Sequence, residues 1–185
     1  MRAGTVATLH AAAADVTFNS TLEGPGGLVV NSSGTTTFKS TVGSATSLDS
    51  IMTDAGSSSD KTIIEGGLVK TVGSQTFNDS VEFGSVLNTT SFRSTSAGNI
   101  FFGRTLTGNG GDLNVGLSGE LVGNLTVSQA LTAVDDLTVF AANATITNTG
   151  NAVSNTVSFQ TTGNVNHFES GAVLIETSEV GGALN

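Results

Sequence analysis

The 185-residue chain has no cysteine, no tryptophan and no tyrosine, and its only proline is Pro25. The absence of cysteine excludes disulfide bonds, thiolate metal sites and cysteine nucleophiles together. Large aromatic residues are too few to fill a thick globular core, yet Val, Leu, Ile and ten Phe are too many for a disordered chain. With 24 glycines in addition, the composition favours a thin core made of small repeated layers.

Positive charge is scarce. The chain has six Lys and Arg against fifteen Asp and Glu, a formal net charge of -9, and no base follows Arg104. Nucleic-acid binding needs basic residues that displace counterions from phosphates, so this class of function is excluded. No apolar run approaches the roughly 20 residues that span a bilayer, so we expect no membrane insertion.

Short apolar pairs separated by one residue run through most of the chain. This alternation predicts brief strands with one buried face. Examples are Val16 and Phe18, Val81 and Phe83, Leu113 and Val115, Leu125 and Val127, Leu137 and Val139, Ala144 and Ile146, Val157 and Phe159, and Val173 and Ile175. Turn residues lie between them, in groups such as "GPGG", "NSSG", "DAGSSSD", "GNGG" and "TNTGN".

One stretch of the sequence recurs. "DVTFNSTLEGPGGLVVNSSG", from Asp15 to Gly34, is echoed 84 to 85 residues later by "GNIFFGRTLTGNGGDLNVGLSG", from Gly98 to Gly119. The echo repeats apolar, glycine and hydroxyl residues but no acid, base or nucleophile. Such a pattern indicates repeated architecture rather than a repeated site.

A solenoid explains the echo better than an antiparallel sandwich, because only in a solenoid does each turn stack on a similar turn. Phe18 and Phe38 are 20 residues apart, and the longer echo corresponds to about four such spacings. We therefore predict an all-β fold, a parallel β-helix with about 20 residues per rung. About nine rungs spaced 4.8 Å apart would form a rod roughly 40 Å long. Its predicted buried rows include Val16, Phe18, Phe38, Phe77, Phe92, Ile100, Phe102, Val115 and Val139.

The predicted organisation is an N-terminal edge or cap segment over 1–14 and continuous solenoid repeats over 15–185. Only "ATLHAAAAD", from Ala7 to Asp15, has helical propensity, and it fits a cap or the frayed end of a rung equally well. The C-terminal "EVGGALN" begins another copy of "GGLVVN", from Gly26 to Asn31, and shows no polar cap. We expect an open C-terminal end that is satisfied by covalent continuation or by self-association.

Two segments resemble a known class of proteins. "TTTFKSTVGSATSLDSIMTDAG", from Thr35 to Gly56, and "VKTVGSQTFNDSVEFGSVLNTTSFRSTSAGNIFF", from Val69 to Phe102, are similar to the β-strand repeats of large bacterial surface proteins, the filamentous haemagglutinin-like and autotransporter passenger adhesins. The resemblance implies a right-handed parallel β-helix, secretion, and a role in adhesion or cell-surface structure. It brings no catalytic motif.

Catalytic candidates are few. Asp135 and Asp136 are adjacent, and neighbours on a strand point to opposite faces, so we expect them not to share a substrate. His10 and His167, the only histidines, stand near opposite ends of the sequence, which argues against a histidine triad or metal cluster.

Ion binding and ice binding are weaker alternatives. "GNGGDLNVG", from Gly108 to Gly116, faintly matches a calcium-binding nonapeptide, with Asp112 and Asn114 as candidate calcium ligands. Its earlier echo has Leu28 where calcium would require an oxygen, so the ligand set does not repeat, and a glycine-rich corner with a solvated aspartate is the simpler interpretation. Threonine pairs at 35–37 and 145–147 hold no common register, so strand propensity accounts for them.

We therefore expect a non-enzymatic extracellular rod or fibre on a bacterial surface, without a cofactor. Its predicted partners are other copies or further repeats of itself, together with a glycan or another cell-surface ligand. The alternatives are a polysaccharide lyase or glycosidase-like β-helix, and a calcium- or ice-binding solenoid.

Overall fold

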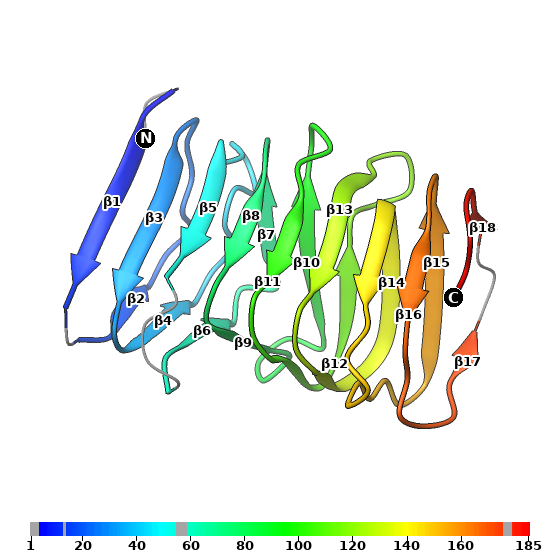
Figure 1. Cartoon of the computed structure of the whole chain (residues 1–185). Helices are drawn as coiled ribbons and strands as arrows, with labels where there is room; N and C mark the ends of the chain where they lie inside the picture. The colour runs from blue at the N-terminus through cyan, green and yellow to red at the C-terminus, as the bar shows by residue number, and fades with distance from the viewer. Residues whose placement is uncertain (1–3, 13, 55–58, 176–178) are drawn as a thin grey trace.

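The computed structural model describes residues 4–12, 14–54, 59–175 and 179–185. In these residues the chain forms eighteen strands and no helix, and the named strands pair in parallel to form a β-solenoid of about 7 turns. Figure 1 shows the turns stacked from β1 at the N-terminal end to β17 and β18 at the C-terminal end. Parts of the predicted N-terminal segment (1–3 and 13), of the "DAGSSSD" turn (55–58) and of the C-terminal region (176–178) lie outside the described residues. No helix able to cross a membrane occurs in the described part of the chain.

The strands form three faces. The first face contains β1 (Val6–Ala11), β3 (Gly27–Ser32), β5 (Ser50–Thr53), β8 (Gln75–Phe77), β11 (Ile100–Phe102), β13 (Val122–Val127), the last part of β14 (Leu131–Ile146) and β16 (Val165–His167). The second contains β2 (Val16–Phe18), β4 (Thr35–Phe38), β6 (Lys61–Ile64), β9 (Ser80–Phe83) and the first residues of β12 (Leu106–Val115) and of β14. The third contains β7 (Leu68–Thr71), β10 (Thr89–Ser94), the rest of β12, the middle of β14, β15 (Thr156–Thr161), β17 (Leu174–Ile175) and β18 (Glu179–Val180).

The alternation of apolar and polar residues places the core inside these three faces. In β10, for example, Phe92 is buried while Ser91 and Arg93 on either side face outward. The predicted buried rows are confirmed from Val16 to Val139, with Phe18 only partly buried at the edge of the core.

Phenylalanine rings fill the widest part of the interior. Phe77 and Phe102 occupy paired positions on successive turns and stack with ring centroids 5.3 Å apart. Phe92, from the third face, meets both rings edge-on at 5.5 and 5.0 Å. These offset and edge-to-face contacts add to the burial of the rings and fix the layers in register.

The turns are mostly longer than predicted. Along the first face, paired residues of successive strands are 19 to 25 positions apart, so the chain makes about 7 turns where nine rungs were expected. The stack of strands is accordingly roughly 34 Å long. The 20-residue spacing of Phe18 and Phe38 is confirmed, because these residues pair directly in the parallel sheet.

The long echo does not correspond to a whole number of turns. Its first copy places Phe18 on the second face, whereas the matching Phe102 lies on the first face. Interpreting the 84 to 85 residues as whole rungs was therefore wrong. Each face has the same inward and outward alternation, so one sequence pattern suits more than one face.

The ends of the described stack are strands. The first residues of the stretch from Ala7 to Asp15, which has helical propensity, belong instead to β1 (Val6–Ala11), which pairs with β3. At the other end Leu184 pairs with Val165, on the face that also contains Leu28, so the partial second copy of "GGLVVN" does continue the stack. Ile175 occupies an inward position of β17 opposite Val157 but is 52% exposed.

Replacing Phe102 by Asp should unfold the chain or lower the free energy of unfolding by several kcal/mol, because an unpaired charge would enter the fully buried layer. Phe101→Asp is the matched control, since this neighbour faces outward on the same strand. Far-UV circular dichroism with urea measures both variants. Equal stability of the two would contradict the assignment of inside and outside.

Candidate functional site

Three aspartates gather on the outside of the third face. Asp112 of β12 and Asp135 and Asp136 of β14 are half-buried, and carboxylate oxygens of all three lie within 4.8 Å of one another. We call these residues the acidic cluster. The expectation that Asp135 and Asp136 point to opposite faces is therefore wrong.

A β-bulge explains this arrangement. Gly111 pairs with Val134 and Leu113 pairs with Leu137, so one residue of β12, Asp112, lies opposite two residues of β14. A bulge of this kind breaks the strict alternation of side chains and turns an additional residue toward the same side. Val134 and Leu137 remain buried while both aspartates between them face outward.

The cluster makes hydrogen bonds to neighbouring turns. Asp136 Oδ1 accepts hydrogen bonds from the Asn155 amide at 2.9 Å and from the Thr156 backbone N–H and hydroxyl at 3.0 and 2.5 Å. Asp135 accepts one from the Ser154 hydroxyl at 2.9 Å, and Asp112 accepts one from the Thr89 hydroxyl at 3.2 Å. These contacts join successive turns, which is a structural role.

Of the two predicted calcium ligands, only Asp112 belongs to this cluster. Asn114 lies two residues further along β12, paired with Ser91 and Thr138 on the flanking strands. Calcium takes six to eight oxygens. The cluster offers three carboxylates, and one oxygen of Asp136 already accepts three hydrogen bonds. The three carboxylates alone are therefore an incomplete set of calcium ligands.

The two histidines lie in different environments at opposite ends of the stack. His10 is exposed on β1, where its Nδ1 lies 3.3 Å from the Asn31 amide nitrogen. His167 on β16 occupies the inward row below Ile146 and packs against Phe159, with ring centroids 5.5 Å apart. The absence of a histidine triad or metal cluster stays a prediction.

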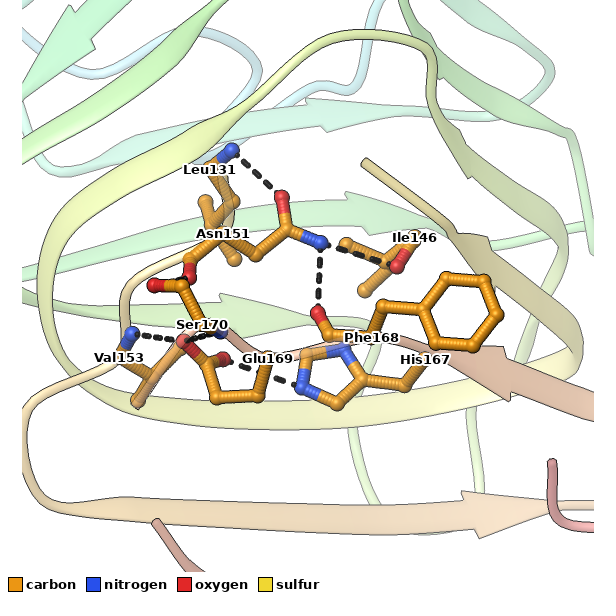
Figure 2. A network of polar contacts seen from close by, with 8 residues as sticks. All are labelled: Leu131, Ile146, Asn151, Val153, His167, Phe168, Glu169 and Ser170. Atoms are coloured by element: carbon orange, nitrogen blue, oxygen red, sulfur yellow. Dashed lines mark hydrogen bonds and ion pairs between the residues drawn. The ribbon is translucent and has the colours of Figure 1, made fainter. Parts of the chain in front are cut away.

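His167 belongs to a buried polar network (Figure 2). Its Nε2 lies 3.2 Å from Glu169 Oε2, and the side chains of the two residues are only 7% and 8% exposed. Glu169 Oε1 accepts hydrogen bonds from the backbone N–H groups of Val153 and Ser170 at 3.1 and 3.3 Å. Through Glu169, the pair thus links the loop after β16 to Val153 on the preceding turn.

Asn151 completes this network. Its side chain is fully buried, accepts a hydrogen bond from Leu131 N–H at 2.8 Å, and donates to the carbonyls of Ile146 and Phe168 at 2.9 and 2.8 Å. One amide therefore joins three segments of backbone. Enclosure from solvent and full use of its polar atoms indicate a structural role.

Asp79 is a buried acid that the sequence analysis missed. It is 3% exposed and accepts hydrogen bonds from the hydroxyls of Thr53 at 2.7 Å and Thr62 at 2.8 Å, which belong to the first and second faces. Burial raises the pKa of its carboxyl group, while the two hydroxyl donors act in the opposite direction. A raised pKa suits a general acid, but this carboxyl is enclosed between two faces rather than open to a substrate.

A ladder of asparagines runs along one corner of the solenoid. Asn99 Oδ1 accepts a hydrogen bond from Asn124 N–H at 2.8 Å, and Asn143 Oδ1 accepts one from Asn164 N–H at 2.9 Å. Asn143 also donates to Asn124 Oδ1 at 2.9 Å, and Asn164 Oδ1 accepts from Ala183 N–H at 2.9 Å. We call Asn99, Asn124, Asn143 and Asn164 the asparagine ladder.

The sequence contained a signal for this ladder. Glycine precedes Asn99, Asn124 and Asn164, and a Cβ atom at Gly163 would lie 2.2 Å from Asn143 Oδ1. Glycine therefore makes room for the asparagine of the turn above. The repeated Gly-Asn pairs are the sequence signal by which this ladder could have been recognised.

Outward threonines form broken rows. On the second face Thr17 pairs with Thr37, but Ile63 and Glu82 occupy the same row on the next two turns. Thr107 and Thr132 then resume it, with hydroxyl oxygens 3.2 Å apart. A flat, regular hydroxyl array, as ice binding requires, is absent from this face in the described residues.

Comparison of the chain with protein families, with characterised proteins and with solved structures finds no match.

Acidification should destabilise the protein through His167. Burial lowers the pKa of its imidazole from 6.5, although Glu169 acts in the opposite direction. As the pH falls below about 6.5, the His167 imidazole takes up a proton in the unfolded chain before it does so in the folded chain. The stability gained from burying the neutral imidazole is therefore present above that pH and is lost as the pH falls toward the lower pKa of the folded state. His167→Phe should flatten the pH dependence of the urea midpoint between pH 7 and 5, and the matched His10→Phe should not. Identical profiles for both variants would refute this.

Removal of a ladder side chain should weaken the stack. Asn143→Ala deletes the acceptor for Asn164 N–H and the donor to Asn124, which should lower the free energy of unfolding by about 1–2 kcal/mol. Thr145→Ala is the control, because this side chain faces outward on the same strand. If both variants unfold at the same urea concentration, the ladder contributes nothing measurable.

Proposed function

We propose that this chain is a non-catalytic structural or adhesive part of an extracellular rod on a bacterial surface. The supporting observation is that polar side chains form hydrogen bonds from one turn or face of the solenoid to another. The asparagine ladder, the acidic cluster, Asp79 and Asn151 all bind between turns or between faces of the solenoid. Such groups strengthen a rod along its axis.

A catalytic role has little support in the arrangement of acids and bases. The acidic cluster has hydrogen-bond partners on adjacent turns, and His167 and Asp79 are enclosed in the interior. A lyase needs a base close to such acids. In the described residues Lys61 and Arg93 form ion pairs with Glu82 and Glu120 instead.

Exposed edge strands support the proposed contact with further repeats or with another copy. Val6 and Leu9 of β1 are 62% and 40% exposed, and Leu174 of β17 is 60% exposed. Parallel strands with unpaired backbone groups and apolar side chains accept another strand readily. Stacking of this kind would join solenoids head to tail into a fibre.

Two measurements on the whole chain test the proposed function. Small-angle X-ray scattering over a concentration series should give a rod, with a length that grows as copies associate. Incubation with a polysaccharide panel, followed by detection of new reducing ends and of unsaturated products, should give no turnover. Cleavage of any polysaccharide, or a compact particle in scattering, would overturn the proposal.

A further inference from the structure

The third face contains a pocket of about 390 Å³ on its outer side. Its lining includes Ser91, Arg93, Asn114, Gly116, Leu117 and Phe140, from β10, β12, β14 and the segment after β12. We call it the Gly116 pocket. Its volume lies within the range of small-ligand sites, which is about 300–1,000 Å³.

The pocket exists because one outward row lacks a side chain. Phe92 pairs with Val115 and Val115 with Val139, so Gly116 lies between Arg93 and Phe140 in the row that follows. Gly116 has φ +77, and a Cβ atom there would lie 2.2 Å from the Phe140 carbonyl oxygen. The gap is therefore a fixed feature of the backbone.

A short turn walls the pocket. Leu117 and Glu120 exchange backbone hydrogen bonds at 3.1 and 2.8 Å, and the Glu120 carboxylate pairs with the guanidinium group of Arg93. This ion pair ties the turn to β10. The wall is thus held in place without a ligand, as a preformed site requires.

The polar groups of the pocket have spare hydrogen-bonding capacity. Arg93 Nε is buried and has no hydrogen-bond acceptor. In the part of the chain that the structure describes, the Ser91 hydroxyl and the Asn114 amide show no protein hydrogen bond either. The Ser91 hydroxyl and the Asn114 amide can therefore hydrogen-bond to a ligand, whereas the buried Arg93 Nε is out of a ligand's reach.

The chemistry of the lining selects among ligand classes. A cation is disfavoured because the carboxylate that contacts the lining, that of Glu120, is already paired with Arg93. An anion is disfavoured because that pair is neutral overall and the chain carries a net charge of -9. A wholly apolar ligand would leave Ser91 and Asn114 without partners.

A neutral saccharide meets all of these conditions. Its hydroxyl groups both donate and accept hydrogen bonds, as Ser91 and Asn114 do. Its C–H face can pack on the apolar surfaces of Phe140 and Leu117. From this geometry we propose that the Gly116 pocket is a binding site for an uncharged sugar unit of a glycan. The inference rests on the proposed adhesive function and assigns it to one site.

Binding of neutral oligosaccharides to the whole chain, measured by isothermal titration and on a glycan array, tests this site. Uncharged hexose or N-acetylhexosamine glycans should bind, and sulfated or sialylated ones should bind more weakly. Phe140→Ala and Asn114→Ala should each weaken binding at least about tenfold.

Phe101→Ala and Thr126→Ala are the matched controls, because these side chains face outward on the first face and lie outside the pocket. Both should bind as the unsubstituted chain does, and urea unfolding of every variant separates lost binding from lost folding. Binding that is unaffected by folded Phe140→Ala and Asn114→Ala would overturn the site and leave an adhesive function standing. If the unsubstituted chain binds no neutral glycan, the proposed sugar site is refuted. The proposed rod function is tested separately, by the scattering and turnover measurements.

Discussion

The structure depends on one constraint, the parallel pairing of each turn with the next. Parallel strands hold equivalent backbone positions about 4.8 Å apart, so each side chain lies directly above one from the previous turn. An inward side chain must therefore pack against the inward side chains of both the preceding and the following turn. Phe77 and Phe102 stack in this way, and Gln75 is accommodated between Ile51 and Ile100 because its amide donates to the Arg93 carbonyl at 2.7 Å.

The same constraint governs the corners, where polar residues rather than apolar ones stack. Asparagine side chains reach the next turn with an acceptor and a donor, so a column of them satisfies backbone groups that the corner leaves unpaired. At Gly163 this close approach leaves no room for a Cβ atom. Sequence repetition at the corners thus has a different physical cause from repetition in the core.

The exceptions to regular stacking create the chemically distinctive places on the surface. A bulge opposite Asp112 brings Asp135 and Asp136 to one side, and the missing side chain of Gly116 leaves a hollow beside Phe140. Both lie on the third face. In a solenoid, a binding site can arise from an irregularity of this kind without disturbing the core, because the inward rows on either side continue.

The sequence alone determined the fold class and most of the core. Period-two alternation and the Phe18 to Phe38 spacing depend on local strand geometry and on the direct pairing of neighbouring turns, which composition and spacing reveal. It did not determine the length of the turns, because loops at the corners vary and shift all later residues around the axis. For that reason the echo at 84 to 85 residues was wrongly interpreted as a whole number of rungs.

Only the tertiary structure decided the environments of the polar residues. Asp135 and Asp136 share a side because of a bulge that depends on the partner strand, and His167 meets Glu169 only where the loop after β16 folds under the core. The Gly116 pocket requires three neighbouring strands in register. Such contacts depend on which residues of adjacent turns are paired. The alternation of apolar and polar residues within one strand does not reveal which strand lies next to it or in which register.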